Sequence, residues 1–155
     1  MNEIFMKRAI QLSLDNMRKD AGGPFGAVVV KDGKIIGEGW NQVTSTNDPS
    51  AHAEVVAIRE ACKNISHFDL SGAEIYASCE PCPMCLSAIY WARIGKIYYA
   101  NTRHDAAKIQ FDDELLYQEI SKDIKDRKIP MSQCCHDEAL KVFTEWQNKQ
   151  DKIRY

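Results

Sequence analysis

Apolar and polar positions alternate along residues 1–100 in a way that predicts a regular succession of helices and strands. Short apolar runs bounded by turn residues are typical of covered strands, whereas apolar side chains three or four residues apart mark one face of a helix. In chain order we expect a helix over residues 2–19, strands over 25–30 and 35–40, a polar loop over 41–50, a helix over 51–64, a strand over 73–77, a helix over 83–94 and a strand over 96–100.

Two of these helices carry a specific expectation about burial. The helix over residues 83–94 is apolar nearly all round, so we expect it to be buried and to end at Gly95. In the helix over residues 51–64, one buried stripe is expected from four positions at i, i+3, i+7 and i+10: Val55, Ile58, Cys62 and Ile65.

The order of the elements favours an α/β fold. An Asp-Gly pair at residues 32–33 predicts a tight hairpin between the first two strands. Helices follow the second and third strands, and strand–helix–strand units imply parallel pairing with right-handed crossovers. We therefore expect a three-layer α/β/α sandwich, in which helices cover both faces of a mixed sheet.

Beyond residue 100 the pattern is weaker. Residues 112–123 are expected to be helical, residues 129–134 to form a short edge strand, and residues 137–148 to form a terminal helix. Four apolar positions at i, i+3, i+4 and i+7 support the terminal helix: Ala139, Val142, Phe143 and Trp146. Because the sequence contains no internal repeat or linker, its length predicts a single domain over residues 1–155.

Composition narrows the class of protein. The formal charge of −2 at pH 7 gives no basic surface of the kind that nucleic-acid-binding domains carry. Apolar runs fall short of the ~20 residues of a membrane span, and the charged N-terminal region lacks the apolar core of a signal peptide. We therefore expect a soluble cytoplasmic protein that binds neither nucleic acid nor membranes.

Six cysteines in such a chain indicate metal ligands or buried thiols rather than disulfides. Cys62 is expected in the core. The adjacent Cys134 and Cys135 are expected to be structural, and Cys79 is expected to end a buried strand.

The chemistry centres on the stretch from His52 to Cys85. It opens with His52-Ala53-Glu54 and closes with Pro81-Cys82-Pro83-Met84-Cys85. An imidazole and two thiolates suit one zinc ion, and three protein ligands leave an open position, which marks a catalytic site. Glu54 stands two residues from the histidine, where it can handle protons of water. His-x-Glu followed by Pro-Cys-x-x-Cys is the signature of zinc-dependent nucleobase deaminases.

Three other interpretations of this stretch remain open. His52, Cys82 and Cys85 could be ordinary side chains without a metal. Cys79, Cys82 and Cys85 resemble part of an iron–sulfur run, although that run would end in Cys-Pro and leaves His-Ala-Glu unexplained. A structural zinc site in a non-catalytic binding module would need a fourth protein ligand, and the remaining candidates are isolated histidines: His67, His104 and His136.

Almost the whole chain resembles the cytidine deaminase-like superfamily, and within it the bacterial guanine deaminases. The resemblance is carried by six stretches: Gly22-Gly23-Pro24-Phe25-Gly26-Ala27-Val28, Asn47-Asp48-Pro49, Ala51-His52-Ala53-Glu54, Ser78 to Cys85, Ala88-Ile89-Tyr90-Trp91-Ala92-Arg93 and Phe111-Asp112-Asp113-Glu114. The zinc pattern is common to the superfamily, whereas Phe-Asp-Asp and a C-terminal aromatic residue point to guanine. Gln110 departs from the glycine that usually precedes Phe-Asp-Asp.

The resemblance implies a homodimer in which the C-terminal segment, about residues 136–155, covers the pocket of the partner. The residues alone favour a frayed terminus instead. The charged tail ends in Ile153-Arg154-Tyr155, and the resemblance places Tyr155 at the substrate of the other subunit.

The resemblance also assigns roles around the metal. Asp113 is implied as a second catalytic carboxylate near the amine, Asn41 as a hydrogen-bonding partner of the base edge, and Phe25 and Trp91 as stacking walls. The backbone N–H groups of Ala53 and Cys82 are expected to contact the substrate. Each side chain also has an ordinary explanation: a solvated charge for Asp113, a turn residue for Asn41 and a core position for the two aromatic residues.

The expected reaction is zinc-dependent hydrolytic deamination of guanine to xanthine and ammonia. Glu54 takes a proton from water, passes it to the ring nitrogen and then helps to protonate the leaving amine. The alternatives are deamination of adenosine in tRNA, which the charge disfavours, deamination of cytosine or another free base, and the non-catalytic zinc module.

Overall fold

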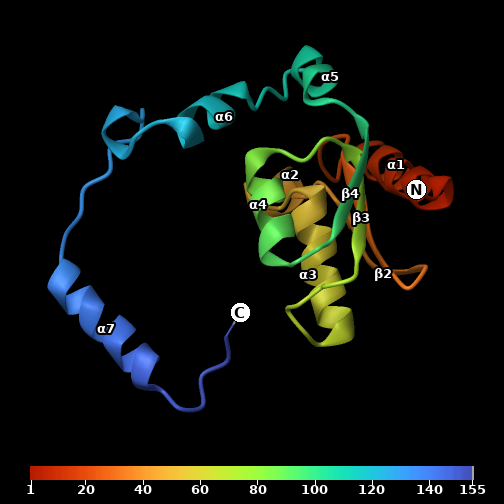
Figure 1. Ribbon diagram of the computed structural model, residues 1–155. Coiled ribbons are helices and arrows are strands. Elements are labelled where there is room, and N and C mark those ends of the chain that lie inside the picture. The colour runs from red at the N-terminus through yellow and green to blue at the C-terminus, as the bar shows by residue number, and fades with distance from the viewer. Residues whose placement is uncertain (155) are drawn as a thin grey trace. The chain divides into compact units, whose positions relative to one another are not determined.

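The computed structural model describes residues 1–154, and Tyr155 lies outside the described residues. The chain divides into two compact units, Met1–Glu114 and the segment from Leu115 onward (Figure 1). The first unit contains α1 (Glu3–Met17), β1 (Gly26–Lys31), β2 (Lys34–Trp40), α2 (Val43–Thr46), α3 (Ala53–Ile65), β3 (Glu74–Cys79), α4 (Pro83–Trp91), β4 (Lys96–Asn101) and α5 (Arg103–Lys108). The remaining elements are α6 (Glu114–Ser121), a 3-10 turn η1 (Ile124–Asp126) and α7 (His136–Asn148).

The sheet is mixed, with the strand order β2-β1-β3-β4. β1 pairs in antiparallel fashion with both β2 and β3, and β3 pairs in parallel with β4. The parallel pairing expected from the strand–helix–strand units is therefore confirmed for β3 and β4, whereas β2 and β3 are parallel but do not pair, because the hairpin partner β1 lies between them. β2, β3 and β4 nevertheless run in the same direction, so their carboxyl ends lie at one edge of the sheet.

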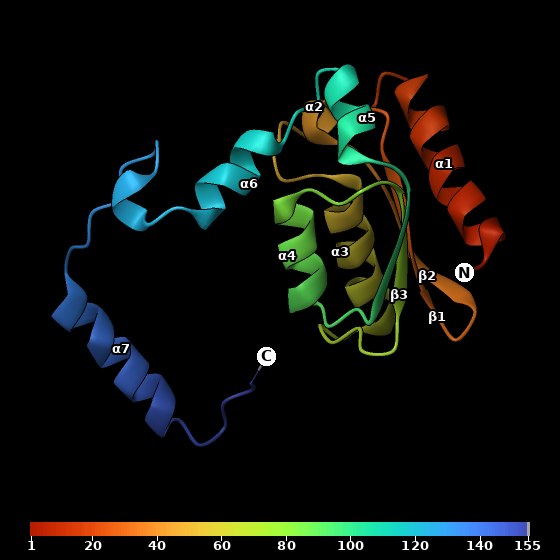
Figure 2. The same ribbon diagram turned by 45° about the horizontal axis from the view of Figure 1, so that its top comes forward.

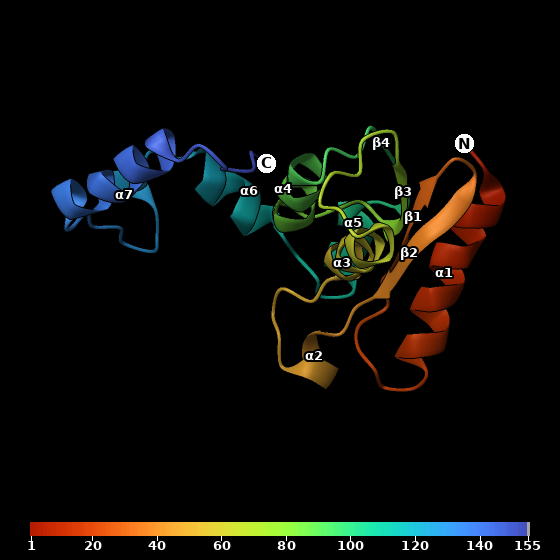
Figure 3. The ribbon, with the colours of Figure 1, turned by 90° about the horizontal axis from the view of Figure 1, so that it is seen from below.

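Helices cover the sheet on both faces (Figures 2 and 3). α1 packs through Leu12 against Val28, Val30 and Tyr76, while α3 and α4 pack against the opposite face. The strand residues of that second cluster are Ala27, Val29, Ile75 and Ala77. Adjacent side chains of β1 thus enter different cores, as the two-residue period of a strand requires. The three-layer α/β/α sandwich expected from the sequence is confirmed.

α3 lies unusually close to β2. A Cβ atom added to Gly39 would come within 2.2 Å of the Ala53 carbonyl oxygen, and one added to Gly37 within 2.3 Å of the Ala57 oxygen. The buried stripe of α3 is consequently made mostly of small residues, namely Ala53, Ala57, Ile58 and Ala61. The predicted stripe is confirmed in part: Ile58 is buried, and Cys62 and Ile65 are partly buried and pack against the same core, whereas Val55 is only partly buried. The prediction missed the three alanines, which lie closest to the glycines of β2.

The composition of α4 predicted a helix buried on all sides, and this prediction was wrong. Pro83, Cys85 and Ile89 are buried, but Tyr90 and Trp91 are 75% and 71% exposed. The helix also ends at Trp91 rather than at Gly95, because Arg93 adopts a left-handed conformation with φ 58°. Apolar composition alone does not distinguish a helix covered by its own chain from one with a free apolar face.

The segment from Leu115 to Arg154 has no buried residue. The terminal helix is confirmed as α7, but the edge strand expected over residues 129–134 was wrong, since no strand is present in this part of the described chain. Cys134 and Cys135 are exposed, so the prediction that they are buried structural thiols was also wrong. Across residues 1–154, none of the helices is long and apolar enough to cross a membrane.

Gln110, which stands where the resemblance expects glycine, has a left-handed backbone conformation. Its φ angle is 71°, and the N–H groups of Gln110 and Phe111 donate to the carbonyl oxygens of Ala107 and Ala106. These two bonds form a Schellman motif at the end of α5, in which glycine is favoured at the position that Gln110 occupies. The chain therefore keeps the turn despite the side chain.

We predict that Gln110→Gly raises the free energy of unfolding by about 1 kcal/mol, because a residue with a Cβ atom loses roughly 1–2 kcal/mol in the left-handed region and glycine does not. The greater freedom of glycine in the unfolded chain offsets part of this gain. Denaturant unfolding measures the change. Gln110→Ala is the matched control and should leave stability nearly unaltered. Equal stability of the glycine and alanine variants would contradict the assignment.

Candidate metal centre

His52 and Glu54 are placed by the start of α3. The sequence placed His52 inside the first turn, but it is the N-cap residue, with extended backbone (φ −69°, ψ 155°). Its carbonyl oxygen accepts from the N–H of Val56, which begins the helical hydrogen bonding. Glu54 follows as the second helical residue. The close approach of α3 to Gly39 therefore fixes the position of both side chains.

Cys82 and Cys85 are placed in the same way by the start of α4. Cys82 is the N-cap, and Pro83 occupies the first helical position, where its missing N–H leaves no bond unmade. His52 Nδ1 lies 3.6 Å from Cys82 Sγ and 3.5 Å from Cys85 Sγ. All three ligand atoms lie within 4.8 Å of one another. The starts of α3 and α4, which follow β2 and β3, thus bring the three ligand atoms together.

The three donors fit a zinc ion. Zinc binds thiolate sulfur at ~2.3 Å and imidazole nitrogen at ~2.0–2.1 Å, and tetrahedral angles then separate nitrogen and sulfur by about 3.6 Å. The observed separations of 3.6 and 3.5 Å agree with that value. One imidazole and two thiols also form the donor set of zinc sites that keep an open position.

The two thiols differ in acidity. A hydrogen bond from Cys85, reinforced by His52, lowers the pKa of Cys82 to about 4 against the opposing effect of burial. Cys82 and burial raise the pKa of Cys85. The hydrogen bond with Cys82 also raises the pKa of His52. Cys82 therefore ionises before Cys85 and supplies a thiolate, the form in which cysteine binds a metal ion.

Glu54 lies against this cluster. It is 7% exposed, and its Oε2 accepts from Cys85 Sγ at 3.4 Å. Burial is the main cause that raises the pKa of the Glu54 carboxyl. A carboxyl group at this place can exchange protons with anything bound beside the three ligand atoms. Cys79 ends β3 as expected and is buried, but its thiol points to the Thr102 carbonyl oxygen, 3.6 Å away, rather than to the cluster.

Asn41 follows β2 and Phe25 precedes β1, so both lie at the edge of the sheet from which α3 and α4 begin. Asn41 is 6% exposed, and its Oδ1 accepts from the N–H groups of Gly23 and Val43 at 3.1 and 3.3 Å. These bonds leave the side-chain NH2 group as the donor that Asn41 can offer. The Phe25 ring meets the Phe111 ring edge to face, with 4.9 Å between centroids.

Asp113 also belongs to this neighbourhood. Burial raises the pKa of its carboxyl, and so does the negative charge of Cys82, while Arg103 acts in the opposite sense. Asp113 therefore lies within electrostatic reach of the metal ligands. The sequence analysis did not predict that the Phe111 ring contacts the Phe25 ring. The only available signal was its place in the Phe-Asp-Asp stretch, which does not reveal that its ring meets Phe25.

The other predicted site residues are not brought together in the same way. Ala53 is buried as the first residue of α3, with an N–H that has no partner within the helix. Trp91 lies at the opposite end of α4 from Cys82, about 13 Å along the helix axis. There it lines a separate cavity of about 390 Å³ with Ser87, Tyr90 and Arg93. Tyr155 lies outside the described residues. The roles of Trp91 and Tyr155 stay predictions.

Comparisons with known proteins agree with this site. Guanine deaminase of Bacillus subtilis (strain 168) is 51% identical over 154 residues, which cover 99% of both chains. Its X-ray structure has a TM-score of 0.96 and covers 100% of this chain and 99% of its own. A guanine deaminase structure from Nitrosomonas europaea is 31% identical, with a TM-score of 0.70 over 74% of this chain and 66% of its own.

A tRNA-specific adenosine deaminase of Buchnera aphidicola subsp. Schizaphis graminum (strain Sg) is 38% identical over 112 residues, 72% of this chain and 74% of that protein. The model of the cytidine and deoxycytidylate deaminase zinc-binding region matches residues 1–101. This region contains both helix starts and all three converging ligands, and the chain therefore belongs to the cytidine and deoxycytidylate deaminase family.

Proposed function

We propose that this protein catalyses the hydrolytic deamination of guanine to xanthine and ammonia. The observation that carries the proposal is the 51% identity to Bacillus subtilis guanine deaminase over 154 residues. The zinc cluster is shared by the family and does not select a base. The identity extends past residue 101, where the family region ends, into the segments that carry Phe111 and Asp113.

His52, Cys82 and Cys85 would hold one zinc ion. When bound, zinc supplies the Lewis acidity that makes water a competent nucleophile near neutral pH. The protein contributes the geometry, because two helix starts hold the donors at the required separations.

Glu54 moves the protons. Its carboxylate takes a proton from the attacking water and delivers it to the ring nitrogen beside C2 of guanine. It then takes the second proton from the hydroxyl group now on C2 and passes it to the amine, so that the C2=O bond forms as the C–N bond breaks and ammonia leaves. One water is consumed and one ammonia is released, so the carboxylate ends in its initial state. Burial of Glu54 keeps bulk solvent from competing for these protons.

The walls orient the base. The free NH2 group of Asn41 suits a hydrogen-bond acceptor on the purine edge, and the Phe25 face suits stacking on the ring. The N–H groups at the start of α3, including that of Ala53, face the substrate in this proposal. Asp113, near the cluster, is the second carboxylate and assists at the amine.

The protein acts as a homodimer in this proposal, with residues 136–155 of one chain covering the pocket of the other. The exposed apolar side chains of α7 support it: Val142 is 64% and Phe143 is 72% exposed. An amphipathic helix with an open apolar face is stable only when another surface covers that face. The swapped segment would bring Tyr155 to the substrate of the partner.

We predict that the purified protein releases ammonia from guanine, with about one zinc ion bound per chain as a three-ligand site requires. Removal of zinc by a chelator should abolish the release, and added zinc should restore it. Adenine, cytosine and a tRNA substrate serve as comparisons in the same assay. Release from another base alone would overturn the assignment of guanine, and absence of any release from a zinc-loaded sample would favour a binding module.

We predict that Glu54→Ala lowers kcat by ~10²–10⁴-fold or more, since ~10²–10⁴-fold is the usual contribution of a positioned proton-transfer group. Zinc content should not change, because Glu54 is not a ligand in this assignment. Glu60→Ala, on the exposed side of the same helix, is the matched control and should retain activity. Loss of zinc in Glu54→Ala would instead identify a metal-binding role.

We predict that Glu54→Ala and Tyr155→Ala complement each other when the two chains are coexpressed. A mixed dimer has one site that combines Glu54 of one chain with Tyr155 of the other, so random pairing should restore about a quarter of the wild-type rate. A chain that carries both substitutions, coexpressed with Glu54→Ala, should give no comparable recovery. Failure of the two single variants to complement would show that each tail serves its own pocket or none.

A further inference from the structure

The loop that leads to Cys82 is joined to the end of β4 by Glu80. The register of β3 and β4 ends with Cys79 opposite Asn101. One residue further, the Glu80 N–H donates to the Asn101 carbonyl oxygen at 2.8 Å. The Glu80 Oε2 accepts from the backbone N–H of Arg103 at 3.1 Å. Glu80 thus bonds to both sides of the turn between β4 and α5, once through its backbone and once through its carboxylate.

The short helix α5 depends on bonds at its start. It has six residues, of which only Ala106 is buried. Thr102 and Asp105 form a capping box, in which the Asp105 N–H donates to Thr102 Oγ1 and the Thr102 N–H donates to Asp105 Oδ2. The bond to Glu80 ties this start to the metal-ligand loop. A six-residue helix is too short to be stable without such support.

The segment that α5 begins continues to Phe111 and Asp113. Its last turn is closed by the bond from the Phe111 N–H to the Ala106 carbonyl oxygen, and the Phe111 ring then meets Phe25. Asp113 follows, within electrostatic reach of Cys82. The Arg103 guanidinium lies 3.8 Å from the Glu114 carboxylate, which links the two ends of the segment. A shift at Arg103 would therefore move Phe111 and Asp113 relative to the metal ligands.

We propose that Glu80 is a positioning residue for the reaction. Its carboxylate holds the start of α5, and through α5 it places Phe111 and Asp113 beside the cluster formed by His52, Cys82 and Cys85. The assigned effect on guanine turnover rests on the proposed function, whereas the attachment of residues 103–113 to the ligand loop does not.

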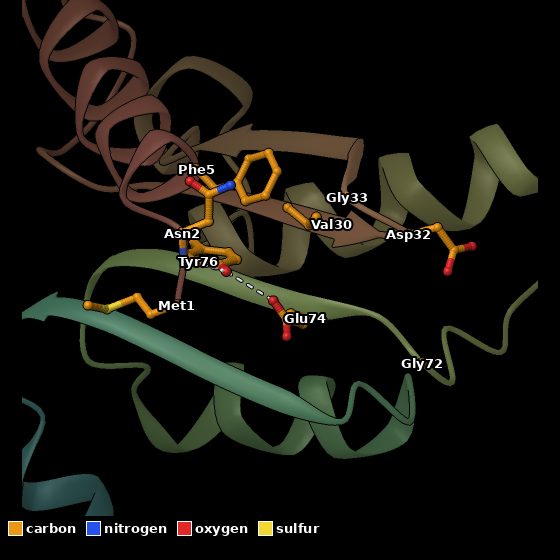
Figure 4. Close-up of a pocket in the computed structure, with 9 residues that line it drawn as sticks. All are labelled: Met1, Asn2, Phe5, Val30, Asp32, Gly33, Gly72, Glu74 and Tyr76. Atoms are coloured by element: carbon orange, nitrogen blue, oxygen red, sulfur yellow. Dashed lines mark hydrogen bonds between the residues drawn. The ribbon is translucent and has the colours of Figure 1, made fainter.

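Three variants of the full-length, zinc-loaded protein test the proposal. Glu80→Ala removes the acceptor for the Arg103 N–H, and Glu80→Gln keeps an oxygen at the same place. Glu74→Ala is the matched control at the other end of the same strand, where Glu74 Oε2 accepts from the Tyr76 hydroxyl at 2.9 Å (Figure 4). The Glu74 carboxylate lines a cavity of about 300 Å³ together with Asn2 and Phe5. Glu74 is the first residue of β3, whereas the metal ligands follow the last residue of that strand.

The first measurement is hydrogen–deuterium exchange of the peptide that covers residues 103–113. Loss of a hydrogen bond to a charged group should speed its exchange by on the order of tenfold or more in Glu80→Ala. Glu80→Gln should restore slow exchange, and Glu74→Ala should not affect this peptide. Unaltered exchange in Glu80→Ala would overturn the proposal whatever the substrate is.

The second measurement is a double-mutant cycle on guanine deamination, with zinc content followed in every variant. Glu80→Ala should lower kcat/KM by about tenfold or more in the wild-type background, with Glu80→Gln restoring most of it, but by less than about twofold in Asp113→Asn. Independent, additive losses would overturn the positioning role, as would loss of zinc in Glu80→Ala. A wild-type protein inactive on guanine would refute the proposed function, while the exchange measurement would still decide whether Glu80 holds the segment.

Discussion

The site depends on a single geometric constraint: three segments must leave the same edge of the sheet. β2, β3 and β4 point in one direction, so the segments that follow them all begin at one edge. α3 brings His52, α4 brings Cys82 and Cys85, and in the proposed site the segment after α5 brings Asp113. α/β folds place their sites outside the carboxyl ends of strands for this reason. β1 runs the opposite way between β2 and β3 without disturbing the convergence.

The convergence also requires small residues in the layer beneath. His52 reaches the thiols only if α3 sits deep on β2, and Gly37 and Gly39 allow this because any Cβ atom would meet the helix backbone. The alanines of α3 follow from the same constraint. The 3.5 Å separation of His52 Nδ1 and Cys85 Sγ is therefore a property of the sheet as much as of the ligands themselves. A larger residue at Gly39 would displace the start of α3 and with it both His52 and Glu54.

The sequence predicts the ligands well because their chemistry and spacing are local. His52 with Glu54, and Cys82 with Cys85, each lie within one helix start, so no knowledge of tertiary structure is needed to pair them. Strand order is different, because a hairpin and a helical crossover leave open whether β3 lies beside β2 or beyond β1. The predicted stripe of α3 missed the buried alanines for a related reason: the apolar period identifies a face, but the glycines of another element decide which side chains fit closest to it. Gln110 shows the reverse case, in which the fold imposes a conformation that the residue itself disfavours.

Exposed apolar surface links stability to assembly in the proposed homodimer. Tyr90 and Trp91 of α4 and Phe143 of α7 lie largely open in a single chain, although each belongs to a helix with an apolar face. In the proposed homodimer, a second copy would cover these side chains and add to the hydrophobic stabilisation that the core of each chain supplies. If the covering segment also supplies Tyr155 to the partner, the pocket is completed by the same event that stabilises the tail. Dilution would then lower activity and stability together, which a pocket closed by its own chain would not show.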